Sequence, residues 1–173
     1  RQAMVERNVE ILFNNAPLGN HENDELRKQV PFSAFMDVAA DLIDRIHGKL
    51  GRMFNKHCAQ DVNLLRSDAG CKAQLAHTDW TESSLEMSRD DCMPLGCVIA
   101  AMPNTPFIVW HGAIRCFDPP TNGRVFHPKV LMLQPGDMLI FRGDLVHAGA
   151  AFNEFNVRIH AYLDVEGVVR PKE

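Results

Sequence analysis

The sequence predicts a mainly β domain with flanking helices. After residue 60, apolar runs of strand length follow one another, separated by turns rich in Pro, Gly, Asn and Asp. One amphipathic helix pattern precedes these runs. The sequence shows no alternation of strands with helices and no glycine-rich phosphate loop. Together these observations predict a double-stranded β-helix, also called a jelly roll or cupin-like barrel.

The length of 173 residues fits one domain with a substantial core. Within it, we expect residues 1–60 to form an N-terminal helical and loop region that packs on the barrel. Residues 61–173 are expected to form the double-stranded β-helix itself. Residues 1–32 are polar and mixed, and we expect a loop over residues 14–20.

A helix is predicted to begin after Ser33, which is a suitable N-cap residue. Apolar residues then recur at spacings of three and four. They are Phe35, Val38, Ala39, Leu42, Ile43, Ile46 and Leu50. We expect this helix to pack on the outside of a sheet. His47 and His57 lie on the helix or at its end, and we interpret both as surface or packing residues.

A hairpin is predicted next. Residues 61–66 form its first strand, residues 67–70 its turn, and residues 71–76 a partner strand that leads into His77. The charged residues 81–94 lack strand periodicity, so we expect a surface loop that could act as a lid.

Four further strands are predicted over residues 95–102, 107–114, 126–133 and 137–141. A tight turn over residues 134–137 separates the last two. Residues 156–165 then alternate between polar and apolar side chains. The polar set is Asn156, Arg158, His160, Tyr162 and Asp164. In a barrel that encloses a charged ligand, this polar face lines the cavity and the apolar face packs against the covering helix. The simpler alternative is a solvated polar face.

The composition is that of a globular protein, with 46% hydrophobic and 23% charged residues. A net charge of −4 gives no overall attraction to nucleic acid or to an anionic membrane. Five cysteines, an odd number, favour a reducing compartment. No apolar run is long enough to span a bilayer, and no signal peptide pattern opens the sequence. We therefore expect an intracellular protein, cytoplasmic or nuclear.

A candidate metal site lies in two separated stretches. His77 and Asp79 are two residues apart at a predicted strand end, so both side chains point to the same side. His147 would complete a set of two imidazoles and one carboxylate, which leaves other metal positions open. Eleven residues later, Arg158 offers a guanidinium suited to a carboxylate.

The stretches "QLAHTDW" and "LQPGDMLIFRGDLVHAGAAFNEFNVRIHAYLDV" resemble the Fe(II)/2-oxoglutarate-dependent dioxygenase superfamily. The resemblance covers residues 61–166. It implies that His77, Asp79 and His147 hold Fe(II), and that Arg158 pairs with the distal carboxylate of 2-oxoglutarate. It also implies molecular oxygen as a reactant, hydroxylation of a substrate C–H bond, and release of succinate and carbon dioxide.

Two further cofactor contacts follow from the resemblance. His160 shares the face of Arg158, where it would hydrogen-bond the metal-proximal carboxylate of 2-oxoglutarate or serve as a buried structural histidine. Ser67 lies near the place where related enzymes put a polar residue on the cosubstrate.

Several alternatives stay open at this level. His111 and His127 are alternative third ligands, but neither has a suitably placed arginine downstream. Four residues are candidates for substrate contact, with core packing or solvated surface as the favoured interpretation: Trp80, Trp110, Arg115 and Arg142.

The function also has alternatives. The same triad could hold zinc in a hydrolase, or belong to a non-catalytic cupin-like binding domain. Position 164 is Asp, where the nucleotide demethylases of the superfamily have a second arginine, which disfavours nucleic-acid repair. The substrate stays unidentified, because the same core serves many substrate classes.

Overall fold

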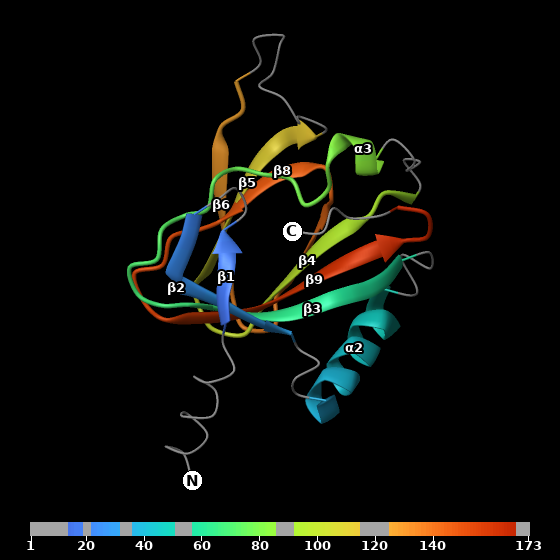
Figure 1. Cartoon of the computed structure of the whole chain (residues 1–173), viewed down its shortest axis with the longest axis horizontal. Coiled ribbons are helices and arrows are strands. Elements are labelled where there is room, and N and C mark those ends of the chain that lie inside the picture. The colour runs from blue at the N-terminus through green and yellow to red at the C-terminus, as the bar shows by residue number, and fades with distance from the viewer. Residues whose placement is uncertain are drawn as a thin grey trace.

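A computed structural model describes residues 14–18, 22–31, 36–50, 57–85, 92–114 and 125–168. Antiparallel strands dominate it (Figure 1). The described elements are β1 (Asn14–Leu18), β2 (Glu22–Pro31), α2 (Met36–Leu50), β3 (His57–Ser67), α3 (Glu82–Leu85), β4 (Leu95–Ala100), β5 (Thr105–Ile114), β6 (Pro128–Leu133), β7 (Met138–Arg142), β8 (Leu145–Gly149) and β9 (Asn156–Val165).

The strands form two sheets. The larger has the order β1-β2-β3-β9-β4-β7, and the smaller has the order β6-β5-β8. Apolar side chains of both sheets meet in one core. Val98 and Phe141 come from the larger sheet, and Phe107 and Val109 come from the smaller one. This arrangement of antiparallel sheets confirms the predicted fold class.

Helix α2 covers the outer face of the larger sheet, as its apolar spacing predicted (Figure 1). Ile46 is almost fully buried there, against Val62 of β3 and Leu163 of β9. Strand β4 is buried on both faces, because Cys97 packs toward this helix side while Val98 packs between the sheets. A strand covered on both faces needs a continuous apolar run, which explains the sequence of β4.

Strand β9 agrees with the interpretation in which its polar face lines a cavity and its apolar face packs against the helix. Ile159, Ala161 and Leu163 belong to the cluster under α2. Arg158 and His160 point to the other side and line an internal cavity. The polar face therefore lines this cavity at Arg158, His160 and Tyr162, whereas Asp164 near the end of the strand is partly exposed.

The structure corrects the predictions for the N-terminal part. Residues 14–18, expected in a loop, form β1, which pairs with β2. Strand β2 pairs with β3 and so extends the larger sheet. His57 begins β3 rather than ending the helix. A boundary between an N-terminal region and a core at residue 61 stays a prediction, and Ser33 lies outside the described residues.

The hairpin predicted over residues 61–76 is wrong. Strand β3 pairs with β2 and β9, so its neighbours come from elsewhere in the chain. Residues 72–76 form no strand, although isolated bridges at Cys71 and His77 align this segment with Phe152 and His147. Lys72 and Leu75 are exposed, so the segment never buries one face as a regular strand would.

The surface loop expected over residues 81–94 is also corrected in part. It contains the short helix α3, whose Leu85 is buried against Trp80. A lid role for this segment stays a prediction. No described helix is long and apolar enough to cross a membrane.

Leu163 tests the packing between β9 and α2, because its side chain is 0% exposed. Leu163→Ala should lower the free energy of unfolding by about 2–5 kcal/mol through lost burial and a residual cavity. Leu75, 63% exposed, is the control, and Leu75→Ala should change this free energy by less than about 0.5 kcal/mol. Urea unfolding measures both, and equal effects would contradict the described packing.

Candidate metal centre and anion pocket

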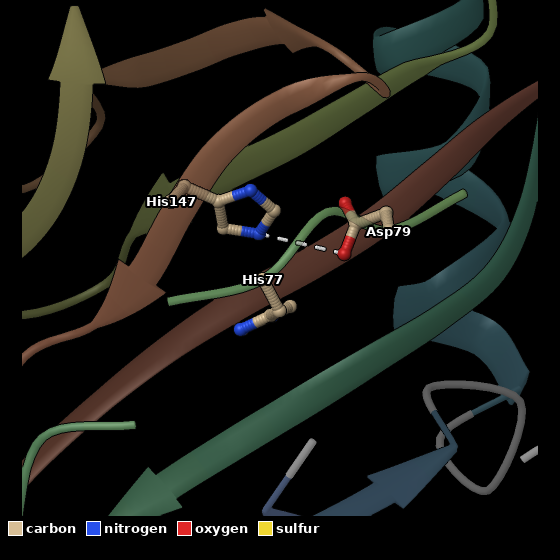
Figure 2. Close-up of side chains that lie close together, drawn as sticks. All are labelled: His77, Asp79 and His147. Atoms are coloured by element: carbon tan, nitrogen blue, oxygen red, sulfur yellow. Dashed lines mark ion pairs between the residues drawn. The ribbon is translucent and has the colours of Figure 1, made fainter. Parts of the chain in front are cut away.

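His77, Asp79 and His147 come together between the sheets, as Figure 2 shows. One ligand atom from each lies within 4.8 Å of the others. His147 belongs to β8, whereas His77 and Asp79 lie on the segment beside it. Two imidazoles and one carboxylate at this separation can hold one metal ion.

Backbone pairing brings the two histidines together. The N–H of His77 donates to the carbonyl of His147 over 2.9 Å, and the N–H of His147 donates to the carbonyl of His77 over the same distance. Residues paired in this way carry their side chains on the same face of the ladder. The ring centroids are 4.6 Å apart as a result.

Hydrogen bonds fix the orientation of both rings. Nδ1 of His77 lies 2.8 Å from the carbonyl oxygen of Leu75, and Nδ1 of His147 lies 2.9 Å from that of Leu145. A carbonyl only accepts, so each Nδ1 carries the proton. Nε2 of each ring is thereby left as the metal-binding atom, an orientation common among metal-ligating histidines.

Asp79 supplies the negative charge of the cluster. Its side chain is 6% exposed, and Oδ1 lies 3.4 Å from Nε2 of His147. Burial alone would raise the pKa of Asp79, but His147, through its charge and hydrogen bond, and then His160 and His77 lower this pKa to about 2. Oδ2 has no hydrogen-bond partner among the described residues. A buried carboxylate oxygen left in this state fits a metal cation.

The neighbouring strand leaves space for this carboxylate. A Cβ atom built on Gly96 of β4 would lie 2.9 Å from Oδ2 of Asp79 and would overlap the ring of Phe141. Only glycine avoids both contacts.

His147 is enclosed by aromatic rings. The Phe107 ring stacks on it at a centroid distance of 5.4 Å, and the Phe141 ring lies at 4.6 Å. Burial would lower the pKa of His147, but the charge and hydrogen bond of Asp79 raise it. Burial and then the charge of His147 lower the pKa of His77, and they outweigh the hydrogen bond to Leu75 and the charge of Asp79, which raise it.

Arg158 carries a buried positive charge beside the metal-ligand cluster. It is 3% exposed, its Nη1 donates to the hydroxyl of Ser67 over 2.9 Å, and its Cζ lies 4.9 Å from the centroid of the Phe152 ring. None of the described residues gives it a carboxylate partner. Burial, followed by the charge of Arg27, lowers the pKa of Arg158 to about 9. A buried guanidinium without a carboxylate fits an anionic ligand.

One cavity of about 80 Å³ joins the triad to Arg158. His160 lies between them on β9, with its Nε2 3.9 Å from Oδ2 of Asp79. Burial lowers the pKa of His160 to about 4, and the charges of His147 and Arg158 act in the same direction, so this imidazole is neutral at pH 7. The cavity is therefore lined by a metal-ligand cluster and by the buried guanidinium groups of Arg158 and Arg27.

The other candidates lie outside this cluster. His111 and His127 are exposed. Trp80 is fully buried in the core, and Arg142 is paired with Asp144 through two hydrogen bonds of 2.9 Å. Trp110, on β5, is partly exposed, and Arg115 lies outside the described residues. The core-packing interpretation of Trp80 is confirmed.

Sequence analysis missed three polar side chains that line the cavity: Arg27, Gln29 and Gln74. The first two lie in the polar N-terminal stretch, which carried no recognisable motif. Gln74 lies three residues before His77 and was assigned only to a strand. Their place in the cavity depends on the pairing of β2 with β3 and on the hydrogen bond between Gln74 and Gly149 of β8, which no local pattern reveals.

No protein-family model matches the sequence, and no curated protein matches it. Solved structures do match. HygX from Streptomyces hygroscopicus, with nickel, 2-oxoglutarate and hygromycin B bound, is 12% identical with a TM-score of 0.68 over 98% of this chain and 80% of its own. SnoK, a non-haem α-ketoglutarate-dependent carbocyclase from nogalamycin biosynthesis, is 14% identical with a TM-score of 0.64 over 94% and 74%.

A third match is a prolyl hydroxylase from Trichoplax adhaerens, in complex with a hypoxia-inducible factor peptide. It is 14% identical, with a TM-score of 0.53 over 95% of this chain and 76% of its own. The chain therefore has the fold of the non-haem iron and 2-oxoglutarate-dependent enzymes, as its motifs predicted.

Proposed function

We propose that this protein is an Fe(II)- and 2-oxoglutarate-dependent oxygenase. The observation that carries the proposal is the buried Arg158, which has no carboxylate partner among the described residues and lies in the same cavity as His77, Asp79 and His147. A metal triad alone fits several chemistries. A metal triad and a buried guanidinium that line the same cavity fit a ligand that binds the metal at one end and the guanidinium at the other.

The triad fits a divalent metal. The Nε2 atoms of His77 and His147 are oriented for it, and Oδ2 of Asp79 lacks a hydrogen bond within the described structure. Two histidines and one carboxylate on one side of the ion leave positions for a chelating ligand and for oxygen. This donor set is the one associated with non-haem Fe(II) oxygenases.

The pocket fits the distal carboxylate of 2-oxoglutarate. Arg158 lies two residues before His160 on β9, or about 6.6 Å along the strand. A short dicarboxylate can therefore reach Arg158 while its 2-oxo acid end lies at the metal. Ser67 holds Nη1 of Arg158 in place. His160, neutral and near the triad, is proposed to donate to the metal-proximal carboxylate.

When bound, the metal and 2-oxoglutarate supply the oxidising chemistry, which consumes molecular oxygen and releases succinate and carbon dioxide. The protein holds the distal carboxylate on Arg158 and orients the two imidazoles. Phe107 and Phe141 keep water away from His147. Such an enclosed site strengthens every charge interaction within it.

Hydroxylation of a C–H bond is the outcome that we propose. Proteins with this fold include a carbocyclase and an epimerase as well as a hydroxylase, so the fold alone does not choose the outcome. A zinc hydrolase or a binding domain on the same triad would leave the buried cation at Arg158 without a role, so neither explains the cavity as well.

His147→Ala tests the metal assignment. It should abolish measurable Fe(II) binding and succinate release, because the three ligands act together on one ion. His111, an exposed histidine on the adjacent strand β5, is the matched control, and His111→Ala should leave both unchanged. Metal analysis after anaerobic loading and a succinate assay check this. Full activity in His147→Ala would show that His147 is not a metal ligand.

The pH dependence of metal affinity tests the Asp79–His147 pair. Because the pKa of His147 is raised, its imidazole in the metal-free protein keeps a second proton, on Nε2, above pH 6.5, where an ordinary histidine is mostly neutral. Metal binding must displace this proton. The affinity for Co²⁺ should therefore keep rising above pH 6.5, by up to about tenfold per pH unit, until His147 has titrated. A Co²⁺ affinity that does not change above pH 6.5 would contradict the interaction between Asp79 and His147.

Arg158→Ala tests the cosubstrate assignment. It should weaken 2-oxoglutarate binding by about 30-fold or more, which corresponds to about 2–5 kcal/mol for a buried charge pair. Arg158→Lys should weaken it less, since lysine keeps the charge but loses the paired geometry. Calorimetry with Co²⁺-loaded protein measures both. Metal affinity should be unchanged, and unchanged 2-oxoglutarate affinity in Arg158→Ala would refute the pocket.

A further inference from the structure

The two segments that carry the metal ligands are joined by few backbone hydrogen bonds. Besides the His77–His147 pair, the N–H of Gln74 donates to the carbonyl of Gly149, and Cys71 pairs with Phe152. Residues 72–76 form no strand. The backbone between these contacts therefore lacks the regular ladder that would hold His77 and Asp79 against β8.

Arg27 of β2 crosses between the two segments. Its Nη2 donates to the carbonyl of Lys72 over 2.7 Å and to the carbonyl of Ala150 over 3.0 Å. The same nitrogen lies 3.4 Å from Sγ of Cys71. Lys72 precedes His77 by five residues, and Ala150 follows His147 by three. One guanidinium thus binds the main chain of both ligand-bearing segments.

The position of this guanidinium is closely constrained. Arg27 is 2% exposed, and a Cβ atom built on Gly149 would lie 2.9 Å from its Nη1. The same Cβ would fall on Oε1 of Gln74, which accepts a hydrogen bond from the Gly149 N–H over 2.8 Å. Gly149 therefore leaves the space that Arg27 and Gln74 need beside β8.

We propose that Arg27 is a positioning residue of the metal centre. It lines the cavity that contains the metal ligands, and it acts by holding the main chain that carries them. A fixed backbone places His77, Asp79 and His147 at binding distance before the metal arrives, so binding does not have to order them. This proposal rests on the metal site of the proposed function. It also gives the N-terminal strand β2 a part in the active centre.

The test compares Arg27→Met and Arg27→Lys with Arg45→Met. Arg45 is the matched control, because its side chain is 73% exposed on α2 and its partner there is Asp41. The probe is Co²⁺ alone, titrated against a competing chelator dye, with the visible Co²⁺ spectrum recorded on the saturated proteins. Thermal unfolding of the metal-free proteins reports stability separately.

Arg27→Met should bind Co²⁺ about tenfold more weakly, at the lower end of the effects known for residues that support metal ligands. Its Co²⁺ spectrum should differ from that of the wild type, since the ligands no longer meet in one geometry. Arg27→Lys should recover part of the affinity, because an ammonium group can still reach a carbonyl. Arg45→Met should match the wild type in both readouts.

An Arg27→Met protein with a lowered melting temperature but wild-type Co²⁺ affinity and spectrum would overturn the proposal, leaving Arg27 with a role in stability only. If Arg27→Met does not fold, Gly149→Ala decides the question, because its Cβ would lie 2.4 Å from Oε1 of Gln74 and 2.9 Å from Nη1 of Arg27 and would displace both groups without removing either. Unchanged Co²⁺ affinity in Gly149→Ala would again overturn the proposal. A wild-type protein that binds no Co²⁺ would instead refute the proposed function.

Discussion

The reciprocal backbone hydrogen bonds between His77 and His147 are the constraint on which the candidate site depends. They join a segment without regular strand structure to β8, and they place two imidazoles on one face. Asp79 follows two residues later and completes the cluster. The rest of the fold supports this contact, because β5 covers the His147 ring and β4 leaves room for the Asp79 carboxylate at Gly96.

The enclosed charges explain the remaining features of the cavity. A carboxylate and a guanidinium buried between apolar sheets are costly unless each has a partner of opposite charge. Oδ1 of Asp79 pairs with Nε2 of His147, but Oδ2 has no hydrogen bond in the described structure. Within the described part of the chain, Arg158 contacts the Ser67 hydroxyl and the Phe152 ring but no carboxylate. A metal ion would offset the burial of the Asp79 carboxylate, and a dianion would offset the burial of the Arg158 guanidinium. The two buried charges therefore support binding of a metal ion together with a dianion.

Much of this arrangement could be predicted from local sequence patterns. The alternation in β9 separated its polar face from its apolar face, the resemblance to the dioxygenase superfamily predicted that the polar face lines a cavity, and the spacing in α2 predicted its packing. The bridges from Cys71 to Phe152 and from His77 to His147 could not be predicted, since each joins residues 70 or more positions apart in the sequence. Strand β1 was missed because Asn14, Asn15 and Pro17 are poor strand formers that pairing with β2 overrides. Arg27 was missed for a related reason, because its partners are backbone carbonyls, which leave no sequence motif.

A crystal structure of the protein with Ni²⁺ and 2-oxoglutarate tests the central claim most directly, since nickel holds the site without turnover. We expect the metal on Nε2 of His77, Nε2 of His147 and the carboxylate of Asp79. The distal carboxylate of 2-oxoglutarate should contact the Arg158 guanidinium inside the same cavity. A metal bound elsewhere, or a 2-oxoglutarate molecule that leaves Arg158 without an anion, would contradict the claim that this cavity binds both.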